Sequence, residues 1–238
     1  MISRRRTVLG MLLLGWMAAV AAQEIPQPFM GTYTVEWRGI NAGTSTLELS
    51  RLGGNDYVYR SSNVARGLFR LAFPDAITQI SHFSIVDGMV RPTSYHGDDG
   101  SSDKKRDVDL LFDWKAMRVT GTAEEKPVDL PLKPNTQDSL SVQIALMREL
   151  AAGHSPEHFW LITKDELNDY EYTREGNVKL DTPLGKIDTV VYRSQHRGSS
   201  RVTRLWCAPS LGYLPVRAQQ SRHGKPEFTL NIRELKRS

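Results

Sequence analysis

The single cysteine of the chain, Cys207, is the residue whose type best suits a nucleophile. A reactive thiolate needs an electropositive neighbourhood and a base within reach. Arg204 is near in sequence, but in an extended strand a residue three positions away projects from the opposite face. Leu205 shares the face of Cys207, where a cysteine behaves as a small apolar residue. A structural thiol in a hairpin is therefore favoured, and an intermolecular disulfide and a thiol enzyme stay open as alternatives.

Acidic residues gather after His96, where carboxylate oxygens could hold a hard cation. The stretch contains Asp98 and Asp99 and continues with Asp103 and Asp107. Its order lacks the Asp-x-Asp-x-Asp-Gly register of a calcium loop. The sequence also contains no phosphate-binding loop, dinucleotide fingerprint or Gly-x-Ser-x-Gly elbow. We therefore predict no metal ligands, no cofactor and no catalytic residues, and hence a protein that is not an enzyme.

Arginines near two expected hairpin tips are candidates for contact with an anionic component. The guanidinium group suits carboxylate and phosphate partners. The four candidates are Arg193, Arg197, Arg201 and Arg222. The alternative is that charged hairpin tips only solvate the protein and protect the edges of its sheet.

Large apolar residues are the candidates for binding a hydrophobic ligand. The stretch RGLFRLAFPDAI, residues 66–77, is dense in hydrophobic residues and poor in turn chemistry. It either lines a groove open to a lipid tail or an unfolded segment, or it is plain core, which is favoured. Over the whole chain, the candidate groove residues are Trp37, Phe69, Phe73, Phe112, Trp114 and Trp160.

Period-two alternation of apolar and polar residues dominates the elements that must position these side chains. Residues 33–38, 107–114 and 228–233 alternate in this way, as expected for strands with one dry and one wetter face. Turn signals such as Gly53-Gly54-Asn55 and His223-Gly224 recur about every ten residues. Many short strands at that spacing predict an all-β sandwich, barrel or roll.

One segment, residues 135–153, breaks this rhythm and predicts a single amphipathic helix over about 137–152. Its apolar side chains recur at helical spacing, namely at Leu140, Ile144, Met147 and Ala151. Thr136 or Asn135 is expected to cap its start, and Gly153 to close its end. Such a helix plugs an open end of the sheet or covers one face. No linker or repeat interrupts the chain, so residues 23–238 are predicted to form one domain.

The N-terminus predicts export. Three arginines, residues 4–6, precede the apolar run 8–22, which is typical of a signal peptide with cleavage after Ala21 or Ala22. The run is shorter than the about 20 residues that span a bilayer, so we expect a periplasmic protein with no transmembrane segment. Removing the three arginines lowers the formal net charge from +4 to +1, which argues against nucleic-acid binding.

Several short motifs follow one another along the chain: FMGTYTVEW (29–37) followed by Ala42-Gly43, LFDW (111–114), QDSLSVQIAL (137–146), TPLGKIDTVVY (182–192) and the hairpin 206–216. Together they resemble the periplasmic proteobacterial family known as domain of unknown function 3108. The resemblance implies a long antiparallel sheet that curls into a spiral β-roll, or half-barrel, with the helix packed inside the curl. It also implies similarity to periplasmic envelope-integrity proteins, and it implies no catalytic residues.

These observations lead to one expected function and two alternatives. We expect a non-enzymatic periplasmic binding or scaffolding protein in cell-envelope homeostasis that uses the apolar concave face of its curled sheet. The first alternative is a carrier of a lipid or other hydrophobic ligand, and the second is a hydrolase or thiol enzyme. The expected partner is an envelope protein or a hydrophobic ligand, and the sequence predicts no oligomeric state.

Overall fold

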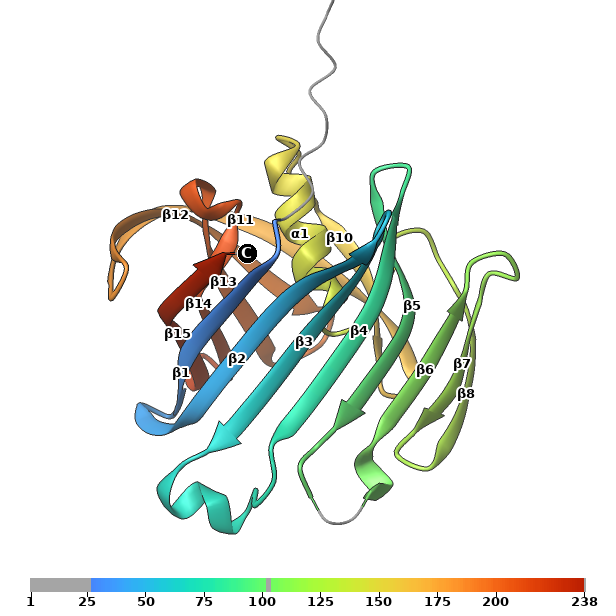
Figure 1. Ribbon diagram of the computed structural model, residues 1–238, viewed down its shortest axis with the longest axis horizontal. Helices are drawn as coiled ribbons and strands as arrows, with labels where there is room; N and C mark the ends of the chain where they lie inside the picture. Colours follow the sequence, from blue (N-terminus) through green and yellow to red (C-terminus); the bar gives the residue numbers. More distant parts are fainter. Residues whose placement is uncertain (1–26, 102–103, 238) are drawn as a thin grey trace, which may run out of the picture.

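The alternating sequence folds into one long curled sheet in the computed structural model, which describes residues 27–101 and 104–237 (Figure 1). The first eight strands are β1 (Phe29–Trp37), β2 (Ile40–Gly53), β3 (Asp56–Ala65), β4 (Ile77–Val86), β5 (Met89–Asp98), β6 (Val108–Asp113), β7 (Arg118–Ala123) and β8 (Lys126–Pro131). The remaining seven are β9 (Thr136–Gln137), β10 (His158–Thr163), β11 (Glu166–Thr182), β12 (Gly185–His196), β13 (Arg201–Ala208), β14 (Leu214–Arg222) and β15 (Lys225–Arg237). Three short 3₁₀ helices are η1 (Gly67–Leu71), η2 (Lys104–Arg106) and η3 (Pro209–Leu211).

The sheet is an almost continuous antiparallel meander. Its strand order is β8-β7-β6-β5-β4-β3-β2-β1-β15-β14-β13-β12-β11-β10-β9. The first and last of the long strands pair in the middle of the sheet, with Tyr33 opposite Ile232. Within residues 27–101 and 104–237, the two-residue strand β9 is the only one that pairs in parallel, and its partner is β10. The predicted all-β fold with one helix, in a curled and unclosed sheet, is confirmed.

The helix α1 (Ser141–Ala151) lies within the curl, at the end where the β4–β5 turn is found (Figure 1). Ile144 and Leu146 on this helix are fully buried, in the same apolar cluster as the inner faces of the strands. Arg148 donates from Nη2 to the carbonyl oxygen of Gly88 in the β4–β5 turn, at 3.1 Å. The helix therefore plugs one end of the curl, and the strands around it form the main core.

The start of α1 differs from the prediction, because Asp138 caps it and not Thr136 or Asn135. The Asp138 carboxylate accepts hydrogen bonds from the backbone N–H groups of Leu140 and Ser141, both at 2.8 Å. The Ser141 hydroxyl in turn accepts from the N–H of Asp138 at 3.0 Å, which makes a reciprocal capping box. Thr136 is not free for this role, because its hydroxyl donates to the Lys133 carbonyl at 2.7 Å.

Both ends of the sheet carry short strands, and ion pairs link them. Lys126 lies 3.4 Å from Asp165, and Lys164 lies 2.7 Å from Glu124. These pairs join the β7–β8 turn to the β10–β11 turn, although no strand ladder connects β8 to β9. We call this junction the seam.

Two sequence predictions concern parts of the chain outside the described residues. The expected signal peptide, residues 1–22, lies outside them, as does Asp103. Within the described residues, no helix has the length and apolar character needed to cross a bilayer.

Candidate ligand-binding groove

The antiparallel meander places alternate turns at opposite ends of the curl. α1 fills one end, and the opposite end carries the β1–β2, β12–β13 and β14–β15 turns together with the β3–β4 connection (Figure 1). We call this second end the open end. On the inner face of the sheet at the open end lies a groove of about 400 Å³, which we call the apolar groove.

The floor of the apolar groove comes from strands that meet in the middle of the sheet. Trp37 at the end of β1 stands directly opposite Phe228 of β15. Val35 stands opposite Gly43 of β2, and all four residues line the groove. A Cβ atom at Gly43 would lie 2.2 Å from the carbonyl oxygen of Val64 on β3. Glycine is therefore required at this position, because β3 approaches β2 too closely for a side chain.

The wall of the groove is the β3–β4 connection, which contains η1. The N–H of Arg66 donates to the carbonyl oxygen of Ala42 at 2.8 Å and so fixes the connection to β2. Phe69 then meets Trp37 edge-on, with ring centroids 5.8 Å apart and an interplanar angle of 71°. The N–H of Phe73 donates to the Phe69 carbonyl at 3.0 Å, which turns Phe73 into the groove as a second aromatic wall.

The same connection exposes its other apolar residues to solvent. Leu68 and Leu71 are 83% and 85% exposed, and Phe73 is 39% exposed. No residue of η1 is buried. The expectation that residues 66–77 are plain core is therefore wrong, because the chain leaves the sheet here and only one side of η1 contacts it. The alternative of a groove-lining segment agrees with the structure.

Arginines lie beside the groove on the β1–β2 turn and on the β3–β4 connection. The Arg38 guanidinium lies over the Trp37 ring, 4.7 Å from its centroid, and forms an ion pair with Glu227 at 3.8 Å. Arg66 and Arg70 are exposed on either side of Leu68, and neither has an ion-pair partner among residues 27–101 and 104–237. An apolar interior with arginines at its rim suits an amphiphile with an acidic head.

Three of the six predicted groove residues meet in this groove, namely Trp37, Phe69 and Phe73. The other three lie elsewhere. Phe112 is buried in the main core. Trp114 follows β6, where its Nε1 donates to the Pro92 carbonyl at 2.6 Å. Trp160 lies between the buried Phe159 and Leu161 and so faces the other side of the sheet, where the Lys133 ammonium sits 3.3 Å from its ring centroid.

The groove residues that were not among the predicted ones are Val35, Ala42, Gly43, Thr44, Asn63, Val64, Ala65, Ile77 and Phe228. Alternation already marked Val35 and Phe228 as members of dry strand faces. It gave no sign that β1 and β15 are neighbours, and that pairing is what places the two residues in one site.

The predicted anionic-contact arginines do not form one site. Arg193 on β12 stands opposite Arg204 of β13, and Arg204 is bound to Glu175 with Nε 2.7 Å from the carboxylate. Arg201 stands opposite Arg222 at the open end. Since Arg201 lies three residues before Arg204, it projects from the other face of β13. Arg197 is exposed in the β12–β13 turn.

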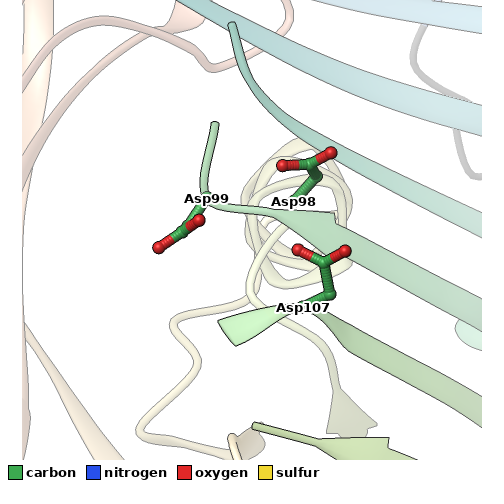
Figure 2. Close-up of side chains that lie close together, drawn as sticks. All are labelled: Asp98, Asp99 and Asp107. Atoms are coloured by element: carbon green, nitrogen blue, oxygen red, sulfur yellow. The ribbon is translucent and has the colours of Figure 1, made fainter. Parts of the chain in front are cut away.

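The acidic stretch after His96 does bring three carboxylates together, as Figure 2 shows for Asp98, Asp99 and Asp107. One ligand atom from each lies within 4.8 Å of the others. Asp99 is already engaged, because it accepts from the Ser101 hydroxyl at 2.6 Å and pairs with Arg106 at 3.6 Å. His96 takes no part, since its Nδ1 lies 2.7 Å from the carboxylate of Asp109. The Oδ1 atom of Asp107 is buried and accepts no hydrogen bond from the described residues, and the prediction of no metal site stays a prediction.

Cys207 is fully buried on β13, opposite Val190 of β12. Burial raises the pKa of its thiol to about 12, so the thiolate is disfavoured. The structure therefore offers the properties of a structural thiol, as the hairpin interpretation predicted.

The chain is similar to known proteins at the level of family and fold. The family model described as "Protein of unknown function (DUF3108)" matches residues 32–224. No curated protein is a significant match. A β-barrel-like protein of domain of unknown function DUF1849 from Brucella abortus has 10% sequence identity and a TM-score of 0.54, over 90% of this chain and 98% of that one. The MucA/MucB complex of Pseudomonas aeruginosa has 14% identity and a TM-score of 0.40, over 90% of this chain and 53% of that one.

Proposed function

The chain belongs to the family of unknown function DUF3108, and we propose that it is a non-enzymatic binding protein of the bacterial periplasm that takes up an apolar chain in the groove at its open end. The ligand class that fits is an acyl chain, carried by a lipid or by a free fatty acid. The expected role in the cell envelope follows from this ligand class and from the predicted export signal.

One observation carries the proposal: the inner face stays hollow and apolar where α1 does not reach it. The groove volume of about 400 Å³ falls within the ~300–1,000 Å³ typical of small-molecule sites. Its walls are aromatic and aliphatic, from Trp37, Phe69, Phe73 and Phe228. Folded proteins seldom leave such a surface without a binding role.

The expected strength of binding follows from the number of methylene groups that the groove can shield from water. Each methylene group removed from water contributes about 0.8 kcal/mol, so a chain of about eight methylenes gains roughly 6 kcal/mol before the cost of immobilising it. Such a gain supports reversible capture and release. It does not support permanent retention.

Tryptophan fluorescence tests the proposal directly, because Trp37 lies in the groove. We expect 12-bromododecanoic acid to quench the emission of the protein, since a bromine atom close to the indole is an efficient quencher. The Trp37→Phe variant should lose this quenching, while it keeps a ring of similar shape in the groove.

The matched control is Trp160→Phe, since Trp160 lies outside the groove. The emission intensity that this variant loses on adding the quencher should equal the intensity that the wild type loses. Quenching that survives Trp37→Phe, or that falls in Trp160→Phe alone, would place the binding site elsewhere. Native mass spectrometry of protein purified from the periplasm then identifies the natural ligand, and a retained peptide in place of a lipid would contradict the acyl-chain assignment.

A further inference from the structure

The most exposed large apolar residues of the described chain are Leu68 and Leu71. Both belong to η1, a 3₁₀ helix, in which residues three apart eclipse one another because a turn contains three residues. The two leucines therefore project together on one side of η1. Phe69 faces away from them and contacts Trp37, so η1 has an inner side in the groove and an outer apolar side in solvent.

Basic residues flank the two leucines on the same connection and on the turns beside it. Five lie on the β1–β2 turn, on the β3–β4 connection and on the strand ends that border the β14–β15 turn: Arg38, Arg66, Arg70, Arg222 and Lys225. Three acidic residues accompany them, namely Asp75 on the connection, Glu36 near the end of β1 and Glu227 near the start of β15, and Glu227 is paired with Arg38. The acidic cluster of Figure 2 borders the β3–β4 connection, because Asp98 stands opposite Thr78 at the start of β4 and Gly100 packs against the backbone of residues 75–76. The outer side of the segment 66–71, which is η1 with the residue before it, is therefore apolar and carries two arginines and no acidic residue.

This combination is the physical signature of a surface that binds lipid bilayers. Exposed leucines enter the boundary between headgroups and acyl chains, and arginines beside them meet anionic headgroups. A protein partner of opposite charge would satisfy the arginines. It would leave unexplained why the leucines adjoin a groove sized for an acyl chain.

We propose that the side of the open end around η1 docks on an anionic bilayer, with Leu68 and Leu71 inserted and Arg66 and Arg70 on the headgroups. This inference rests on the proposed acyl-chain function and extends it. Docking brings the mouth of the groove, between η1 and β1, to the depth of the acyl chains. A chain then passes from the bilayer into the groove without crossing water.

Co-sedimentation with vesicles tests the docking. We expect the full protein to bind vesicles of phosphatidylglycerol and phosphatidylcholine, and to bind those of pure phosphatidylcholine much less. The double variant Leu68→Ser/Leu71→Ser should lose at least about tenfold in partitioning, because each inserted leucine removes a sizeable apolar area from water. The double variant Arg66→Gln/Arg70→Gln should lose about tenfold on anionic vesicles alone, and salt should weaken the wild type in the same direction.

The matched control is Leu52→Ser/Leu111→Ser. These leucines are 60% and 63% exposed but lie outside η1, so vesicle binding should be unchanged. An equal loss of vesicle binding in both leucine double variants would overturn the docking surface. Wild-type protein that does not bind anionic vesicles would overturn it as well. If the η1 leucine pair fails to fold, as judged by its melting curve, the arginine pair and the salt series decide the question.

Failure of the docking and failure of the groove are distinguishable. Quenching of Trp37 by soluble 12-bromododecanoic acid needs the groove and no bilayer. If quenching persists in a protein that does not bind vesicles, docking is refuted and the groove stands. If vesicles bind but Trp37 is not quenched, the groove function is refuted and the surface stands.

Discussion

Asp138 is the buried carboxylate on which the start of α1 depends, and its removal has a calculable effect. Its carboxylate accepts three hydrogen bonds, from the Ser81 hydroxyl at 2.6 Å and from the N–H groups of Leu140 and Ser141 at 2.8 Å. In Asp138→Ala the helix loses its cap, which costs about 1 kcal/mol. The buried Ser81 hydroxyl loses its acceptor, which costs about 1–3 kcal/mol more. We therefore expect the free energy of unfolding to fall by about 2–4 kcal/mol.

The pH dependence of stability supplies a second, independent readout at this residue. Burial raises the pKa of the Asp138 carboxyl above its usual value of 3.8, against the hydrogen bonds from Ser81 and the backbone that lower it. In the unfolded chain the proton leaves at the lower, ordinary pKa. Between the two pKa values the native state binds more protons, so the contribution of Asp138 to stability is full below the ordinary pKa and is lost as pH rises through the folded pKa.

Urea unfolding followed by circular dichroism measures both effects, with linear extrapolation to water at each pH. Asp138→Asn is the matched variant, because its amide oxygen still accepts from the backbone but it does not titrate. The advantage of the wild type over Asp138→Asn should shrink as pH rises above about 4. Two results would refute the assignment of Asp138 as a buried helix cap with a raised pKa. One is parallel pH profiles for the wild type and Asp138→Asn, and the other is a decrease in the free energy of unfolding of less than about 0.5 kcal/mol in Asp138→Ala.

Three further predictions concern the rest of the molecule. Cys207, whose pKa is about 12, should not react with iodoacetamide at pH 8 in the native protein, and should react fully in urea; mass spectrometry of the adduct checks this. Gly43→Ala should lower the free energy of unfolding by about 1–3 kcal/mol, because its Cβ meets the Val64 carbonyl; it should also weaken the quenching by 12-bromododecanoic acid. Lys164→Met breaks the exposed seam pair with Glu124. The free energy of unfolding measured in urea should therefore fall by about 0.2–1 kcal/mol, and this difference should vanish in high salt.

Local sequence patterns predicted the strands correctly but did not identify the residue that caps the helix. The alternation that begins at Tyr33 and the one that ends at Arg233 correspond to β1 and β15, because side-chain alternation is a property of a single strand. The cap of α1 was missed although Asp138 and Ser141 form a local motif. Thr136 or Asn135 was the predicted cap, but the Thr136 hydroxyl is bound to the Lys133 carbonyl.

The groove was only half predictable. Trp37, Phe69 and Phe73 were named from their type and density, but Trp160 was named on the same grounds and faces the other side of the sheet. Residue type says that a side chain is apolar, and it does not say at which end of a curl the strand position lies. The exposure of η1 was missed for the same reason, because a dense apolar stretch is equally typical of a core.

The sequence by itself determined the class of fold, the single helix, the structural character of Cys207 and the family resemblance. Each of these depends on neighbours within a few residues or on motifs read in order. Only the tertiary structure decided that β1 pairs with β15, that α1 fills one end and leaves the other hollow, and that η1 stands at the mouth of the groove. These arrangements arise from the register and curvature of a 15-stranded sheet, which joins residues about two hundred positions apart and leaves no periodic trace in the sequence.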